Sequence, residues 1–377
     1  MLTTSDVQAP SAHVGREQVD NLLWEQVGRM IDRARSSADL RAHRLQALAA
    51  WRWHEKGRLV PSDFTEKAHS AKVASLLAPL LLSHVRAACD GPILVFKGPE
   101  AAARYPSRSM RPFGDLDLLV REPRLVQRAL LGAGFAEVGD EEVYRDIHHL
   151  RPLSLAGFPL VLEIHARPKW PEGIPAVDLD ELFDAAVPSA VPVEGVSALP
   201  PAQHALLLAA HAWAHAPLAR LFHLVDVAAI RQEARAEEIR TIATDWGLQR
   251  IWEATSAAID DALQDRRGSW PSQTWARHLR DVREQTVFEN HLGRWLSGLS
   301  ALPSGAGVRK GLEAVARDIR PAQQETWGDK WFRSRRALTN AGSPRSRHEI
   351  EVERALRQRR VMAGRSAQNR MRKDDEA

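Results

Sequence analysis

The spacing of apolar positions changes along this chain, and the change occurs near residue 90. In residues 21–53 and again in residues 61–89, apolar side chains recur at the spacing of an α-helix. Residues 90–92, Asp-Gly-Pro, predict a turn, and residues 93–96, Ile-Leu-Val-Phe, predict a short buried strand. We therefore expect helices first and a sheet after them.

The middle of the chain mixes both patterns. Pro99 and Pro123 each stand at a position that suits the first residue of a helix. The expected order after the first strand is helix 99–105, a strand from Asp115, helix 123–132, and strands near 143–150 and 159–165. Such an order predicts a compact α+β unit with a small mixed sheet.

Helical spacing returns after a connection rich in Pro and Val at residues 187–201. The predicted helices cover 202–215, 219–233, 236–246 and 249–264, with more to about 300. From residue 303 the chain becomes rich in Arg and Gln, and its last 35 residues predict solvated helix or disorder. We divide the chain into a leader with N-terminal helices (1–60), an α/β domain (61–195), a helical domain (196–302) and an Arg-rich, partly disordered tail (303–377).

Composition limits the protein class. Of 377 residues, 44% are hydrophobic and one is cysteine, which excludes an intrachain disulfide and a cysteine-based zinc cluster. Residues 1–10 lack the features of a signal peptide, and the most apolar window, residues 76–82, is far shorter than a membrane span and contains Pro79. These features predict a soluble cytoplasmic protein that does not enter a membrane.

The net positive charge of the chain comes from its last 35 residues. From Ser343 onward, ten Lys or Arg residues face six Asp or Glu residues, and this excess equals the net charge of +4 of the whole chain. Residues 1–342 are therefore neutral. A protein that follows a phosphate backbone usually carries a clustered positive face, so the pattern does not favour nucleic acid as a partner.

Two carboxylates stand at the start of an apolar strand. Asp115 and Asp117 are two residues apart, before Leu-Leu-Val, so their side chains point to the same face of the strand. Like charges at the edge of a buried strand repel each other unless a cation lies between them. Oxygen ligands of this kind select Mg²⁺ or Mn²⁺, and we predict such a metal site here.

Glu163 and His165 form a similar pair on a later strand. They alternate with Leu162 and Ile164, so they share one face. Glu163 is a candidate third metal ligand beside Asp115 and Asp117. His165 is a candidate ligand, a proton-handling group or a structural histidine.

Basic and glycine residues flank the aspartate pair. Lys97 and Gly98 follow the first strand and precede a helix, where a glycine lets backbone amides approach an anion and the lysine adds a positive charge. Arg111 lies four residues before Asp115, where it would contact nucleotide phosphates or neutralise the pair.

A further polar stripe lies on the helix 202–215. His204, His211 and His215 fall on one side of that helix, and His223 and Asp226 follow on the next one. The stripe lacks the glutamate that a zinc protease places between its two histidines. It therefore predicts a polar wall facing the α/β unit, or pairing with acids between helices.

These residues resemble a family of uncharacterised bacterial nucleotidyltransferases within the superfamily typified by DNA polymerase beta. The resemblance covers about residues 90–270. The matching positions are Lys97, Gly98, Tyr105, Arg111, Asp115, Asp117, His149, Pro152, Glu163, His165 and Asp226. The chain departs from the wider superfamily in having Lys97-Gly98 where a Gly-Ser pair is usual.

The resemblance implies a nucleotidyltransferase domain between N-terminal helices and a C-terminal helical domain. It implies transfer of a nucleoside monophosphate from an NTP to a small-molecule or peptide acceptor, with release of pyrophosphate, and a role in natural-product biosynthesis. Asp115, Asp117 and Glu163 would be catalytic and would hold Mg²⁺ or Mn²⁺. Lys97, Gly98, Arg111 and His165 would bind the nucleotide.

Two other functions fit the same residues. A glycosyltransferase that uses a nucleotide-sugar also holds its metal with an Asp-x-Asp pair, although it usually has more strands before that pair. A protein of this fold that binds a nucleotide without catalysis would have the same sequence features. The sequence does not determine the acceptor, the base of the NTP or the oligomeric state.

Overall fold

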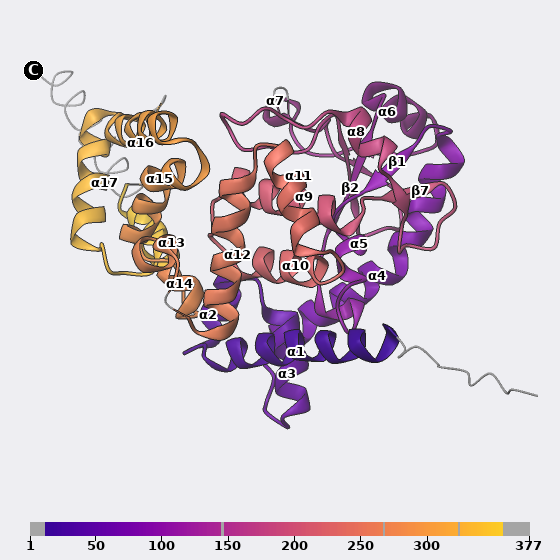
Figure 1. Cartoon of the computed structure of the whole chain (residues 1–377). Helices are drawn as coiled ribbons and strands as arrows, with labels where there is room; N and C mark the ends of the chain where they lie inside the picture. Colours follow the sequence, from indigo (N-terminus) through magenta and orange to yellow (C-terminus); the bar gives the residue numbers. More distant parts are fainter. Residues whose placement is uncertain (1–11, 145–146, 267, 323–324, 357–377) are drawn as a thin grey trace, which may run out of the picture.

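The computed structural model describes residues 12–144, 147–266, 268–322 and 325–356, and it has an α+β architecture (Figure 1). The helices before the first strand are α1 (Ala12–Asp32), α2 (Ser37–Ala42), α3 (Gln46–Glu55) and α4 (Ser62–Ala88). The helices among the strands are α5 (Pro99–Ala102), the 3-10 helix η1 (Arg108–Met110), α6 (Pro123–Gly132), α7 (Glu141–Tyr144) and α8 (Leu179–Asp184).

A mixed sheet of seven strands lies on the right-hand side of the molecule in Figure 1. The strands are β1 (Ile93–Val95), β2 (Asp115–Val120), β3 (Ala136–Glu137), β4 (Leu153–Ser154), β5 (Val161–His165), β6 (Val187–Pro188) and β7 (Val196–Ala198). Their order in the sheet is β3-β4-β5-β2-β1-β7-β6. Strands β5 and β7 run parallel to their neighbours β2 and β1, and the other neighbouring pairs are antiparallel.

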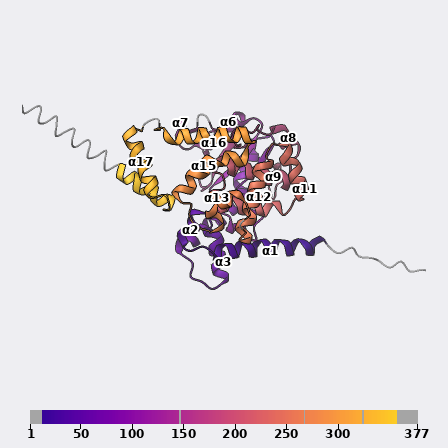
Figure 2. The ribbon, with the colours of Figure 1, turned by 60° about the vertical axis from the view of Figure 1, so that its left-hand side comes forward.

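Helices follow the sheet to the end of the described chain. They are α9 (Pro201–His215), α10 (Leu221–Arg231), α11 (Ala236–Asp245), α12 (Gln249–Gln264), α13 (Trp270–Thr274), α14 (Arg277–Arg280), α15 (Val287–Ala301), α16 (Ser304–Ile319) and α17 (Trp327–Thr339). In both views α1 runs along the lower edge of the molecule beside α12 (Figures 1 and 2).

Two hydrophobic cores cover the two faces of the sheet. Ile93 and Val95 pack in a core with α4 and α6, while Leu94 and Phe96 pack in a larger core with α1, α3 and α9–α14. A strand covered on both faces has apolar residues at successive positions, which explains the unbroken apolar run of β1. The N-terminal helices and the later helices therefore share one core.

Helix α4 is the one helix among those described that is long and apolar enough to cross a membrane. The apolar window at residues 76–82 is only one part of this helix. A single such helix is weak evidence for a membrane location. Seven of its side chains, from Phe64 to Val85, are buried against the sheet and the neighbouring helices, as in a core helix of a globular domain.

The predicted helices and the three central strands are confirmed with small shifts of their ends, but several details were wrong. Residues 143–150 form no continuous strand: α7 ends at Tyr144, residues 145–146 lie outside the described part, and His149 makes only an isolated bridge to His165. The apolar pattern of residues 21–53 divides among three helices.

The connection predicted at residues 187–201 contains the hairpin of β6 and β7. These strands have two and three residues, too few for an alternating pattern to stand out. Val196 lies beyond the predicted domain limit at residue 195, yet β7 pairs with β1 in the sheet. In the predicted tail, α16 packs along α15. Residues 357–377 lie outside the described part, so the predicted disorder there remains a prediction.

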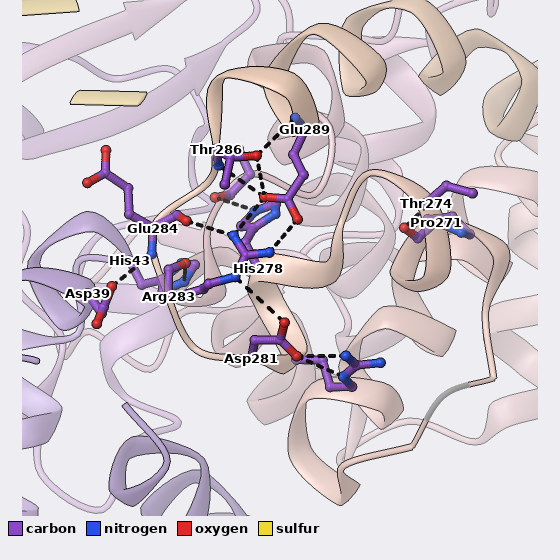
Figure 3. Close-up of polar contacts among 12 residues, drawn as sticks. Asp39, His43, Pro271, Thr274, His278, Asp281, Arg283, Glu284, Thr286 and Glu289 are labelled. Carbon is purple, nitrogen blue, oxygen red and sulfur yellow. Dashed lines mark hydrogen bonds and ion pairs between the residues drawn. The ribbon is translucent and has the colours of Figure 1, made fainter. Parts of the chain in front are cut away.

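A polar junction joins the N-terminal helices to α15 (Figure 3). Arg283 donates to both carboxylate oxygens of Glu289, at 2.8 and 2.6 Å, and Glu289 forms a capping box with Thr286 at the start of α15. The backbone amide of Glu284 donates to Asp39, and His43 Nε2 lies 2.8 Å from the carbonyl oxygen of Arg283. These contacts attach the segment that leads into α15 to helix α2 and to His43, the residue that follows it.

Gly98 connects β1 to α5 in a backbone conformation that other residues rarely adopt, with φ +53°. A Cβ atom at this position would lie 3.1 Å from the carbonyl oxygen of Asp115. We expect Gly98→Ala to lower the free energy of unfolding by about 1–3 kcal/mol, measured by urea denaturation. Gly91→Ala is the control, because a Cβ there meets nothing within 4 Å. Equal stability of the two variants would contradict this explanation of Gly98.

Candidate active site

Strands β2 and β5 place the acidic residues side by side. Their parallel register pairs Asp117 with Glu163 and Leu119 with His165. Leu116, Leu118, Leu162 and Ile164, at the alternate positions of the same strands, are all buried in the core beside α4 and α6. The polar side chains therefore project from the opposite face, toward α9.

Asp117 is fully buried and has two cationic or hydrogen-bonding partners. Its Oδ1 atom lies 2.6 Å from Lys97 Nζ and 2.9 Å from His165 Nε2. Burial alone would raise the pKa of Asp117, but the charge of Lys97 and the hydrogen bond from His165 outweigh it and hold the pKa far below its usual value. The carboxylate is therefore ionised.

The second oxygen of the same carboxylate lacks a partner. Oδ2 of Asp117 is buried and makes no hydrogen bond within the described residues. A buried carboxylate oxygen without a partner is costly, because it has lost its water. An ion bound at this oxygen would remove that cost.

Glu163 and His165 surround the same space. One ligand atom each from Asp117, Glu163 and His165 lie within 4.8 Å of one another. His165 Nε2 lies 3.6 Å from Glu163 Oε2, and His149 Nε2 lies 3.7 Å from the same oxygen. The pKa of His165 is lowered by burial but raised more by its hydrogen bonds to Asp117 and Glu163, so the net shift is upward. This group can hold a divalent metal.

Asp115 shares the face but is not part of that group. It lies two residues before Asp117 on β2, opposite Val161. Burial, followed by the neighbouring charge of Asp117, raises the pKa of its carboxyl. The alternation of side chains along β2 puts Asp115 on the same face as Asp117, whereas the group of possible ligands within 4.8 Å contains His165 in its place.

Three more histidines, His148, His211 and His215, surround the cluster. The ring centroid of His148 lies 5.2 Å from that of His165, and His211 and His215 have ring centroids 4.7 Å apart. His211 Nε2 lies 3.3 Å from Lys97 Nζ. Burial lowers the pKa of His148 to about 3 and that of His215 to about 4, and it lowers the pKa of His211 well below the ordinary value. These rings are neutral at pH 7.

The predicted histidine stripe on α9 divides into two parts. His211 and His215 reach the cluster, as the prediction of a polar wall facing the α/β unit required. His204 is buried about two turns before His211 and lies 2.6 Å from the carbonyl oxygen of Phe96. Sequence reasoning did not select His148, which lies in a segment with little periodicity. Its place next to His149 was the one indication available.

The structure does not bring Arg111 to the carboxylate cluster. Its guanidinium is buried, donates to both oxygens of Asp226 at 2.8 Å, and donates to the carbonyl oxygen of Gly98 at 3.1 Å. Tyr105 donates its hydroxyl to the same Asp226 at 2.7 Å. Arg111 thus connects the turn after β1 to α10, and its planar group is occupied by these partners.

A comparison with protein-family models gives one match. The model described as "Uncharacterised nucleotidyltransferase" matches residues 32–260. This range contains the whole sheet, α9–α11 and most of α12. No curated protein and no solved structure matches the chain.

The buried pair of Arg111 and Asp226 gives a test of the connection between sheet and helices. Arg111→Met leaves the charge of Asp226 buried without its partner, and we expect a loss of about 3–5 kcal/mol in the free energy of unfolding. The double variant Arg111→Met/Asp226→Leu leaves no buried charge and should lose less. Urea denaturation of both variants measures the difference. Equal losses would show that the charge pair does not determine the cost.

Proposed function

The chain belongs to the uncharacterised nucleotidyltransferase family, and from this premise we propose that it moves a nucleoside monophosphate from an NTP to a small-molecule or peptide acceptor, releasing pyrophosphate. The observation that carries the proposal is the meeting of Asp117, Glu163 and His165 within 4.8 Å. The unpartnered Oδ2 atom of Asp117 supports a divalent cation as part of the site. We further infer that the domain is related to the superfamily typified by DNA polymerase beta.

The metal would be Mg²⁺ or Mn²⁺, held by Asp117 and Glu163 with Asp115 on the same face. Carboxylate oxygens suit both ions, and a nearby imidazole favours Mn²⁺ more than Mg²⁺. When bound, such an ion stabilises the negative charge that develops on the oxygens around the transferred phosphorus.

Lys97 lies where its ammonium group could pair either with the carboxylate of Asp117 or with a phosphate of the NTP. Its ammonium group lies 2.6 Å from Asp117 and is 18% exposed, so it balances the carboxylate while remaining accessible. We propose that, with a cation held by Asp117 and Glu163, Lys97 would pair with the phosphates of the NTP. His165 would remain on Asp117 and hold the carboxylate in a fixed orientation.

The backbone at Gly98 would lie along the phosphates. Its positive φ turns the chain sharply after β1, and Arg111 fixes the turn through the Gly98 carbonyl oxygen. Helix α5 has only four residues and contributes little dipole. We therefore assign Arg111 an indirect part in nucleotide binding: it positions the turn, and Lys97 supplies the charge.

The reaction is tested with the full chain and each NTP labelled at the α-phosphorus. The protein is incubated with Mg²⁺ and a cell extract, and labelled products are identified by mass while pyrophosphate is measured. Transfer of the label with equal release of pyrophosphate supports the proposal. Heat of nucleotide binding without pyrophosphate would indicate a binding protein, and turnover of UDP-sugars alone would indicate a glycosyltransferase.

Replacement of the aspartates tests the site directly. We expect Asp117→Asn and Asp115→Ala each to lower transfer by at least about 100-fold, because each removes charge that neutralises the cation. Asp245→Asn, an exposed residue at the end of α11, is the matched control and should retain full activity. Circular dichroism checks that all three variants are folded. Full activity of a folded Asp117→Asn variant would remove this residue from the mechanism.

Metal binding has a readout that does not depend on activity. A ligand that binds only the folded protein stabilises it by about 2.7 kcal/mol at 100 times its dissociation constant. We expect Mn²⁺ or Mg²⁺ to raise the melting temperature of the wild type by several degrees and to leave that of Asp117→Asn unchanged. The same rise in both proteins would place the bound metal elsewhere.

A further inference from the structure

A cavity of about 920 Å³ lies between the C-terminal end of α9 and the last described helices. Its wall consists of residues 215–217 and 219 together with Gln285, parts of α15, α16 and α17, and several of residues 345–356. This volume is in the range of sites that bind small organic molecules. All of the wall beyond residue 219 lies outside the range that the family model matches.

The cavity and the carboxylate cluster share a wall. His215 lines the cavity, and its ring centroid is 4.7 Å from that of His211. His211 in turn lies 3.3 Å from Lys97, which pairs with Asp117. The cavity is therefore connected to the cluster by successive contacts from His215 through His211 and Lys97 to Asp117.

Backbone contacts hold the far wall in place. The amide of Val287 donates to the carbonyl oxygen of Ser343 at 3.1 Å, and the amide of Arg345 donates to that of Gln285 at 2.9 Å. The junction at Arg283 and Glu289 fixes the start of α15 (Figure 3). The wall is thus formed before any ligand binds, which lowers the entropic cost of binding.

Most charged side chains on the wall pair with other residues of the described ranges. Asp318 accepts from Trp295 and pairs with Arg294 at 2.9 Å. The other lining arginines, Arg333 and Arg345, pair with Glu325 and Glu349 at 3.2 and 2.6 Å. Lys330, on α17, has no ion pair or side-chain hydrogen bond to any residue in the described ranges.

Apolar side chains complete the lining. Val287, Val352 and Leu356 are buried and border the cavity, as does Pro217. A ligand that complements these surfaces has an apolar body and a negative group.

We propose that this cavity binds the acceptor, and that the acceptor is a small organic molecule with a hydroxyl and an anionic group, such as a carboxylate or phosphate, that pairs with Lys330. This rests on the proposed nucleotidyl transfer. The acceptor hydroxyl oxygen forms a bond to the α-phosphorus of the NTP, the bond from that phosphorus to the bridging oxygen breaks, pyrophosphate leaves, and the hydroxyl proton passes to water.

The first test measures binding without the reaction. Anilinonaphthalene sulfonate, an aromatic anion, is titrated by fluorescence into the full chain and into Lys330→Glu. We expect the dissociation constant to rise at least tenfold in this variant. Lys67→Glu, an exposed lysine on α4, is the matched control and should bind as the wild type does. Equal binding by Lys330→Glu and Lys67→Glu would overturn the proposal.

The second test separates this proposal from the proposed function. Label from the NTP is followed into the acidic and the non-acidic small-molecule fractions and the peptide fraction of an extract. We expect product in the acidic small-molecule fraction, with a KM for that fraction raised at least tenfold in Lys330→Glu and an unchanged Mg²⁺–NTP melting shift. Label in another fraction only, or an unchanged KM, overturns the acceptor assignment and leaves nucleotidyl transfer intact. No label in any fraction overturns both.

Discussion

The buried carboxylate of Asp117 imposes the main constraint on this structure. A negative charge without access to water is stable only beside positive charge or hydrogen-bond donors, and Asp117 obtains both from Lys97 and His165. Lys97 follows β1, Asp117 lies on β2 and His165 ends β5, so the three central strands must lie in one register for the charge to be balanced. The pairing of the strands and the geometry of the site therefore depend on each other.

A second buried pair extends this arrangement to the helices. Asp226 on α10 receives Arg111 and Tyr105, and Arg111 also holds the carbonyl oxygen of Gly98. The turn that carries Lys97 is thereby fixed to α10, which packs against α9, the helix that carries His211. Since such a pair gains specificity more than stability, its contribution lies in the orientation of the two layers.

The sequence predicted the parts of the site that depend on local periodicity. Alternation along β2 and β5 was enough to place Asp115, Asp117, Glu163 and His165 on shared faces. It did not reveal the register between the two strands, which puts Glu163 opposite Asp117. It also did not reveal that Arg111 is used internally, because its partner is 115 residues away. The short strands β3, β4, β6 and β7 were not predicted, because two or three residues are too few to show an alternation of apolar and polar side chains.

Helix α9 connects the carboxylate cluster with the cavity near its C-terminal end. His211 contacts the lysine of the carboxylate cluster, and His215, one turn later, borders the cavity whose far wall comes from residues after 285. The family match ends at residue 260, before that wall begins. Under the proposed function, a helix that reaches both places would let one segment keep the chemistry while another determines the acceptor. Changes at Lys330 would then alter which molecule is modified, and changes at Asp117 would alter whether transfer occurs.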